Sequence, residues 1–444
     1  MGKFVLTTKL GTHDNGVVID NMNCQMQADL KILVNRNATE VKLDSFFLEL
    51  KRLKLEPSEL AMDLLIIACT MYAADTRIDR MKFAEDSWTR EIELLIPVSE
   101  PDFWETQKER LKQIFRFLTG DLWELQFRAR TDLPSIIPKS KLSRFGLPYT
   151  TDTVCLFSGG MDSFIGAIDL ISNGVQPILL GHAKSADVSP NQKFCETAIR
   201  QAFPEVPLRR IYAFLRIPKK HLFNTEEKTE RGRSFMFLTL GGICASALSS
   251  QSTLVVPENG LISLNLPLTP LRVGSHSTRT THPYYINLMQ ELFNDLQLGV
   301  TINNPYQFKT KGEMLAECTN IPLVQSTKTM SCSHPSGRFQ GVGNSHCGYC
   351  VPCIIRQAAF HNANVTEAKD YRVDIFNNSA LNTLAKRDNI VAFNYLIEKI
   401  ERKPNFIKTL IRSTGPLGDN VEGYIDTYQR GLNEVKSLLS NVRL

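Results

Sequence analysis

Apolar residues are spaced differently in different parts of the chain, and this spacing predicts which elements form. Apolar residues at helical intervals between positions 102 and 118 predict an amphipathic helix. The longest apolar run, at 60–74, follows Pro57-Ser58-Glu59, which is a typical helix start, and it predicts a buried helix. Short apolar stretches predict strands at residues 4–8, 30–34 and 88–98. Together these elements predict a small α+β unit over residues 1–130.

After residue 150 the pattern becomes strand, glycine turn and helix, and it then repeats. An apolar strand at 154–157 leads through a glycine turn to a helical pattern at 161–174, and a second strand follows at 176–181. Strands that alternate with helices are typical of a parallel sheet with crossover helices. We therefore expect an α/β domain, a parallel sheet with helices on both faces, over residues 151–360.

Changes in composition mark the two ends of this domain. Residues 131–150 contain three prolines among basic and hydroxyl residues and have no helix or strand periodicity, so they predict a linker. Beyond residue 360 the pattern is mostly helical, notably at 390–400 and 424–439. We expect residues 361–444 to form a helical cap on the α/β domain.

Composition and charge exclude several classes of protein. The 444 residues are 43% hydrophobic and 22% charged, as in ordinary globular proteins rather than disordered or coiled-coil ones. The 51 Lys and Arg residues against 46 Asp and Glu leave a formal charge of +5, too small an excess to indicate a dedicated nucleic-acid binder. We find no secretion signal and no apolar run of the roughly 20 residues that a bilayer requires, so we expect a cytoplasmic protein without a membrane partner.

A glycine-rich segment, Ser158-Gly159-Gly160-Met161-Asp162-Ser163, joins the first predicted strand of the α/β domain to its helix. Adjacent glycines let the backbone approach a phosphate, the first N–H groups of the helix supply donors, and the two serines add hydroxyl groups. The aspartate fits such a site if it orients a metal ion or fixes the loop. A plain glycine turn is the simpler interpretation, but strand, S-G-G-x-D-S and helix in register favour phosphate binding. No G-x-x-x-x-G-K-[ST] segment occurs, so transfer of the γ-phosphate is the less expected reaction.

Four of the ten cysteines have the spacing of metal ligands. Cys347, Cys350 and Cys353 form two overlapping C-x-x-C units, and Cys332 lies 15 positions before the first of them. In a reducing compartment four thiolates at this spacing indicate a closed tetrahedral zinc site, with an iron–sulfur cluster or unligated buried thiols as alternatives. We interpret the six scattered cysteines as small buried hydrophobic residues, at positions 24, 69, 155, 195, 244 and 318.

The glycine turn resembles the PP-loop of the N-type ATP pyrophosphatases, which holds the β,γ-pyrophosphate of ATP while a substrate oxygen attacks the α-phosphate. The order of the PP-loop and the four-cysteine site resembles that of the 7-cyano-7-deazaguanine synthase (QueC) family, and the resemblance covers residues 151–360. The motif that closes this region, C-G-x-C-x-x-C-x-x-R, runs from Cys347 to Arg356. This resemblance implies an adenine nucleotide alpha hydrolase-like fold. It also implies an ATP-dependent ligase that converts 7-carboxy-7-deazaguanine to its nitrile, releases AMP and pyrophosphate, and uses Mg²⁺ and Zn²⁺.

The resemblance implies roles for individual residues as well. The loop would hold pyrophosphate and Mg²⁺ through Ser158, Gly159, Gly160, Met161, Asp162 and Ser163. Lys311 would act in catalysis with the polar side chains of this loop, and it would neutralise phosphate charge together with Arg233. Glu258 would accept the N–H edge of a guanine-like base. Arg279 is a second candidate substrate contact, since it ends the longer stretch that replaces a short family loop where ammonia and base would bind.

The flanks suggest a subgroup, because housekeeping members are little longer than residues 151–360, whereas this chain has about 150 residues before them and about 80 after. Long forms resemble the QueC-like proteins of bacterial anti-phage systems, including the C component of the Qat system, in which the activated deazaguanine is thought to be attached to a partner protein's N-terminus. This resemblance implies a protein partner from the same operon and a partner-docking role for residues 1–130. Two alternatives stay open: a tRNA-modifying PP-loop thiolase, which should carry a basic RNA-binding appendage, and a catalytically silent scaffold, which should have lost Ser158 or Asp162.

Overall fold

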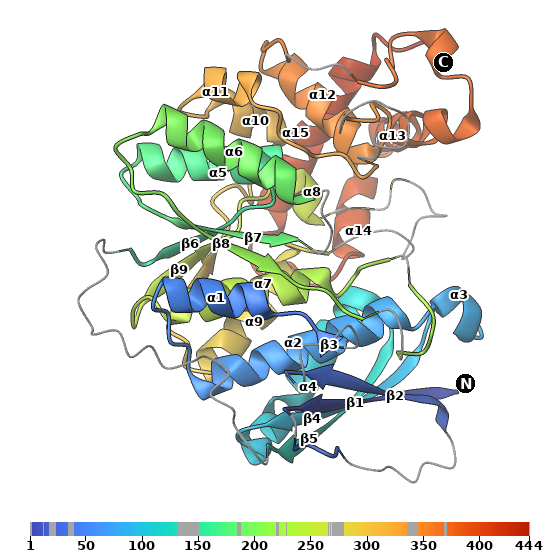
Figure 1. Ribbon diagram of the computed structural model, residues 1–444. Coiled ribbons are helices and arrows are strands. Elements are labelled where there is room, and N and C mark those ends of the chain that lie inside the picture. Colours follow the sequence, from blue (N-terminus) through green and yellow to red (C-terminus); the bar gives the residue numbers. More distant parts are fainter. Residues whose placement is uncertain are drawn as a thin grey trace.

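The computed structural model contains two five-stranded parallel sheets, with helices between them and a helical unit at one end (Figure 1). It describes residues 2–11, 13–16, 24–33, 40–130, 151–183, 188–218, 222–227, 229–264, 266, 268, 279–334, 345–367 and 371–443. The predicted linker at 131–150 lies outside these residues. No helix within the described ranges is both long and apolar enough to cross a membrane.

The first sheet has the strand order β3-β2-β1-β4-β5, and its pairings are parallel throughout. Its strands are β1 (Lys3–Leu10), β2 (Cys24–Ile32), β3 (Glu40–Val41), β4 (Glu91–Val98) and β5 (Leu122–Ala129). Parallel neighbours need a crossover connection rather than a tight hairpin, and helix α4 (Pro101–Thr119) provides it between β4 and β5. The prediction of an α+β unit is therefore wrong, because the N-terminal unit is itself α/β.

Helix α2 (Glu59–Arg77) confirms the predicted helix at 60–74 and explains its apolar sequence. The Ser58 hydroxyl caps its N-terminus by accepting a hydrogen bond from the Ala61 N–H at 3.2 Å. Every residue from Ala61 to Arg77 is buried, because the helix lies between β4 of the first sheet and helix α7 (Arg233–Ser246) of the next domain. A helix that is apolar all round needs such neighbours on every side. The shorter helices α1 (Asp44–Arg52) and α3 (Arg80–Phe83) complete this unit.

The second sheet has the order β10-β9-β6-β7-β8, again with parallel pairings. Its strands are β6 (Thr153–Leu156), β7 (Ile178–Ala183), β8 (Arg209–Phe214), β9 (Ser252–Val255) and β10 (Val300–Asn303). Helices α5 (Met161–Ser172) and α6 (Val188–Ala202) cover one face, and α7 and α9 (Pro283–Asp295) cover the other (Figure 1). The predicted parallel sheet with helices on both faces is confirmed.

The N-terminal unit and the second sheet share one hydrophobic core. Phe115 of α4 meets Phe235 of α7 edge to face, with ring centroids 5.0 Å apart, and both rings are fully buried. The Gly232 N–H donates to the Asp75 carboxylate of α2 at 2.8 Å, and residues 42 and 216 form an antiparallel bridge between the two units. The N-terminal unit is thus built into the body of the molecule.

The C-terminal segment is helical, as predicted, and lies beside the α5 and α6 layer, where it packs on helices of the α/β domain (Figure 1). Helices α13 (Leu384–Arg402) and α15 (Val421–Leu439) contain the helical segments predicted at 390–400 and 424–439, and α14 (Phe406–Arg412) lies between them in sequence. The remaining helices are α8 (Gly260–Leu264), α10 (Lys311–Ala316), α11 (Ile321–Ser326), α12 (Val351–Asn362) and η3 (Asn378–Ala380). Helix α15 packs against α8, α10, α12 and α13, so it joins the cap to the α/β domain.

The shared core predicts that both sheets unfold together. Replacing Phe115→Ala should cost about 3–5 kcal/mol of unfolding free energy, because it removes a buried aromatic ring between α4 and α7. All three tryptophans, at 88, 104 and 123, lie in the N-terminal unit, so tryptophan fluorescence reports the unfolding of that unit. Exposure of the buried Cys244 thiol reports the unfolding of α7 in the second domain. In urea both signals should change at one midpoint, and the variant should shift them together. Phe194→Ala, at a 48% exposed side chain, should leave the midpoint nearly unchanged. Two separate transitions, with only the tryptophan signal shifted, would contradict the shared core.

Candidate active site and metal centre

The candidate site lies where the second sheet reverses its strand order. From β6 the chain adds β7 and β8 on one side and then β9 and β10 on the other, so β6 and β9 are neighbours. In open parallel sheets the carboxyl ends of such a pair leave a crevice in which ligands bind. The glycine loop at 158–163 follows β6 and Glu258 follows β9, so two motifs that are nearly 100 residues apart in sequence reach the same edge of the sheet.

The glycine loop forms the tight turn that its sequence predicts. Gly159 has a φ of +79°, a left-handed conformation that residues with a side chain rarely adopt. Gly160 is the N-cap of α5, and Met161 is its first residue. The hydroxyl oxygens of Ser158 and Ser163 lie 3.2 Å apart across the turn. N–H groups and two hydroxyls thus gather at one helix N-terminus, which is the arrangement that favours a phosphate group.

Asp162 and Lys311 form a buried ion pair, with only 6% and 5% of their surfaces exposed. The Lys311 ammonium donates to one carboxylate oxygen of Asp162. The side chain of Asn259 donates to the other oxygen at 2.6 Å, and its backbone N–H lies 3.3 Å from the same atom. The structure thus brings two of the four predicted catalytic residues into direct contact. Sequence reasoning missed Asn259, whose only signal is its place beside Glu258 at the end of β9.

Glu258, the predicted substrate-binding carboxylate, lies half-buried next to this ion pair. The side-chain amide of Asn304 donates to the Glu258 carbonyl oxygen at 2.9 Å and so fixes its backbone. Burial and the nearby Asp162 carboxylate raise the pKa of Glu258 to about 8. Among the described residues its carboxyl group makes no hydrogen bond or ion pair, so it is available to a ligand, and hydrogen bonds donated by that ligand would favour its ionised form.

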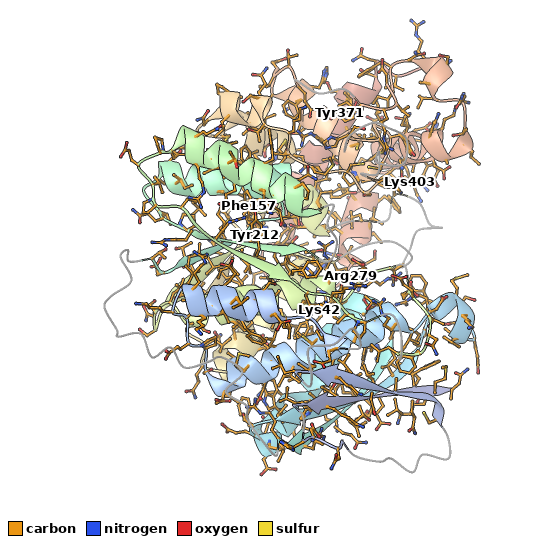
Figure 2. All side chains as sticks on the ribbon, in the orientation of Figure 1. Lys42, Phe157, Tyr212, Arg279, Tyr371 and Lys403 are labelled. Atoms are coloured by element: carbon orange, nitrogen blue, oxygen red, sulfur yellow. The ribbon has the colours of Figure 1, made fainter. Side chains whose placement is uncertain are left out.

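The two predicted arginines lie at other positions. Arg233 is the first residue of α7, and its guanidinium is 4.0 Å from the Glu230 carboxylate. Arg279 donates to the Phe117 carbonyl oxygen at 2.9 Å and lies over the Phe117 ring, 4.4 Å from its centroid. Figure 2 shows Arg279 on the side of the second sheet that faces the N-terminal unit. Their roles toward phosphate and substrate stay predictions, because the described contacts link Arg279 to α4 and Arg233 to its own helix turn.

The four predicted metal ligands converge at the start of α12. Their ligand atoms all lie within 4.8 Å of one another, with Cys332 and Cys350 sulfurs 3.9 Å apart and Cys347 and Cys353 sulfurs 3.8 Å apart. A tetrahedral zinc ion with Zn–S bonds of about 2.3 Å requires sulfurs about 3.8 Å apart, so the donor set fits zinc. Hydrogen bonds from the three neighbouring thiols lower the pKa of the Cys332 thiol, and the backbone N–H of Cys347 donates to its sulfur at 3.3 Å.

Five of the six scattered cysteines agree with their predicted role as buried residues, and Cys24 does not. Those at 69, 155, 195, 244 and 318 are buried, and Cys24 is half-buried. Burial raises the pKa of the Cys155 thiol to about 12, so this group stays neutral and unreactive. The ten cysteines therefore fall into two groups: four clustered thiols that can bind a metal ion, and six dispersed ones that cannot bind it together.

Ser331 and Arg356 connect the metal centre to the glycine loop. Arg356, buried in α12, donates to the Ser331 hydroxyl at 3.3 Å, and this hydroxyl also accepts from the Met161 N–H at 3.4 Å. Sequence reasoning missed Ser331, whose signal is its position directly before the ligand Cys332. Figure 2 labels Tyr371, which packs against the cysteines, and Phe157, which directly precedes the glycine loop in sequence. A metal that fixes Cys332 therefore also fixes a contact of the loop.

Comparison with known families gives a match over part of the chain. The model described as Queuosine biosynthesis protein QueC matches residues 280–364. This segment is QueC-like. It contains Lys311, the four clustered cysteines and Arg356, whereas the glycine loop and Glu258 lie before it. No curated protein sequence matches the chain significantly. The QueC-like segment thus supplies one partner of the buried ion pair and the whole metal centre, and the match supports the resemblance for that part.

The geometry predicts about one zinc ion per chain, held by the four cysteines in a closed, structural site. Elemental analysis of the purified protein should find it, and Cys350→Ser should lower both the zinc content and the thermal stability. Cys24→Ser, at a half-buried cysteine outside the cluster, is the matched control and should retain the metal. Iron with acid-labile sulfide after anaerobic purification would contradict the zinc assignment and favour a thiolase.

Proposed function

We propose that the protein is an ATP-dependent ligase that adenylates the carboxylate of a 7-deazaguanine, with AMP and pyrophosphate as the products of activation. The observation that carries the proposal is the meeting of the glycine loop, Glu258 and Lys311 at the carboxyl ends of β6 and β9. Lys311 comes from the QueC-like segment, so the part of the chain that matches this family contributes directly to the crevice.

The proposed roles follow from the donors present. The N–H groups at the start of α5, with the hydroxyls of Ser158 and Ser163, would hold the pyrophosphate part of ATP. Lys311 would share its positive charge between Asp162 and the phosphates. Asp162 is the one carboxylate of the loop, and a Mg²⁺ ion held there would neutralise charge that develops on the departing pyrophosphate. Glu258 would accept the N–H edge of the base, which its unpaired carboxyl group allows.

The proposed reaction consists of two successive displacements. A carboxylate oxygen of the substrate attacks the α-phosphorus of ATP, the bond from that phosphorus to the bridging oxygen breaks, and pyrophosphate leaves with the electron pair. An amine then attacks the carbonyl carbon of the acyl adenylate, loses a proton and expels AMP, which gives an amide. AMP leaves far more readily than oxide or hydroxide, and this difference is the purpose of the activation. If ammonia is the amine, the amide oxygen attacks a second ATP and releases pyrophosphate, and the adenylated amide then loses AMP and two protons to give the nitrile.

The amine that attacks the acyl adenylate decides which product forms. A free N-terminal amine of a partner protein from the same operon would give a protein conjugate instead of a nitrile, in a role in anti-phage defence. What supports this version is the chain's resemblance to the long QueC-like proteins and the additional N-terminal α/β unit that such a partner could contact. Holding the amine close to the acyl adenylate would supply several kcal/mol through proximity and would protect the intermediate from water.

The test is product analysis with ATP, Mg²⁺, 7-carboxy-7-deazaguanine and an ammonium salt as the source of the amine. AMP and pyrophosphate should form in equal amounts, and Asp162→Asn or Lys311→Met should lower the rate by about 100-fold or more, the size of effect expected for a lost transition-state charge contact. Lys309→Ala is the matched control, because this lysine is two residues away, 38% exposed and paired with Glu317, and its rate should stay within about twofold.

Stability must be measured beside activity, because each single change leaves an unpaired buried charge or a buried carboxamide and can cost about 3–5 kcal/mol. The double variant Asp162→Asn with Lys311→Met removes both charges, so it should melt closer to the parent while staying inactive. ADP and orthophosphate as products would contradict the proposed reaction, and so would a double variant that keeps full activity.

A further inference from the structure

Helix α15 lies outside the QueC-like segment, yet it contacts the turn that begins α10 and carries Lys311. Two charged residues of α15, Arg430 and Glu434, are one helical turn apart and so lie on the same face of the helix. Glu434 is only 7% exposed, which is rare for a carboxylate that lacks good partners. Both side chains point to one short stretch of the α/β domain, residues 308–313.

Glu434 binds the first turn of α10 through both of its oxygens. The Thr310 hydroxyl donates to one oxygen, which the Asn362 amide also approaches at 3.3 Å, and the Gly312 N–H donates to the other at 3.2 Å. Lys311 lies between these two donors in the chain. Its backbone is therefore held on both sides by the same carboxylate.

The turn is also closed by its own capping box, in which Thr310 and Glu313 exchange hydrogen bonds of 2.9 and 3.0 Å. Arg430 pairs with the Glu313 carboxylate and donates to the Phe308 carbonyl oxygen at 3.0 Å. Both members of the capping box thus have a partner on α15. Helix α10 is only 6 residues long, too short to hold its first turn by its own hydrogen bonds.

The approach of Glu434 depends on a glycine. A Cβ atom on Gly312 would collide with the Glu434 carboxylate, although the backbone conformation there is one that any residue adopts. Close contact rather than backbone freedom therefore explains the glycine that follows Lys311.

We infer that Glu434 is a positioning residue for Lys311, and that helix α15 is a working part of the active site rather than a passive cap. Through Thr310 and Gly312 it fixes where the Lys311 ammonium meets Asp162. The predicted effect on catalysis rests on the proposed function, whereas the position of Lys311 can be measured whether or not the protein has that function.

The test uses the full chain with Glu434→Ala and Glu434→Gln, and with Glu422→Ala as the matched control. Glu422 lies on the same helix, is 68% exposed and forms a surface pair with Lys408, so its removal leaves α10 untouched. The first readout is acetylation of Lys311 by an amine-reactive ester, followed by mass spectrometry, with exposed Lys309 as the internal reference. The second is the rate of pyrophosphate release from Mg²⁺-ATP and 7-carboxy-7-deazaguanine.

In Glu434→Ala, Lys311 should be acetylated about tenfold faster, the change expected when hydrogen bonds to a buried charged group are lost. Pyrophosphate release should fall about as much. Glu434→Gln keeps one acceptor oxygen and should lie between the parent and Glu434→Ala, whereas Glu422→Ala should match the parent in both readouts. Unchanged acetylation of Lys311 in a folded Glu434→Ala protein would overturn the inference, and so would faster acetylation with an unchanged rate of pyrophosphate release. A parent protein that releases no pyrophosphate would refute the proposed function instead, and acetylation alone would then decide the position of Lys311.

Discussion

The buried ion pair between Asp162 and Lys311 is the interaction on which the arrangement of the site depends. Two charges removed from water cost more than their attraction returns unless further hydrogen bonds hold them, and Asn259 provides such bonds to the aspartate. The pair joins the loop after β6 to the QueC-like segment, and Glu434 in turn joins that segment to α15. Three stretches of the chain that are far apart in sequence must therefore be in place before the crevice has its charge pattern.

The same dependence appears in the rest of the molecule. Helix α2 belongs to the N-terminal sheet by its connections, but it is buried against α7 of the second sheet, so neither unit has a complete core without the other. Removing the N-terminal unit would expose α7 and change the α/β domain itself. Any role of this unit toward a protein partner therefore has to be probed by surface substitutions, such as at Met81, which is 73% exposed, rather than by truncation.

Sequence alone predicted the parts whose signal is local. The glycine loop, the C-x-x-C units and the apolar helix α2 each carry their pattern within a few residues, and all three form as expected. Strand β5 was not predicted, because this edge strand alternates polar residues with buried ones and lacks a continuous apolar run. Without β5 the sequence gives no sign of the parallel crossover from β4, so the N-terminal unit was interpreted as α+β. The contacts of Glu434 and Arg279 reach 122 and 162 residues along the chain, and no spacing rule relates positions so far apart.

The central claim is that the glycine loop supports attack of a substrate carboxylate on the α-phosphate of ATP. The most direct measurement supplies 7-carboxy-7-deazaguanine labelled with ¹⁸O in its carboxylate, together with Mg²⁺, unlabelled ATP and an ammonium salt, and follows the label by mass spectrometry. Because the attacking oxygen stays on phosphorus when AMP leaves, the account predicts one ¹⁸O atom in the AMP from each turnover and none in pyrophosphate. Unlabelled AMP, or ¹⁸O that appears in orthophosphate, would contradict it.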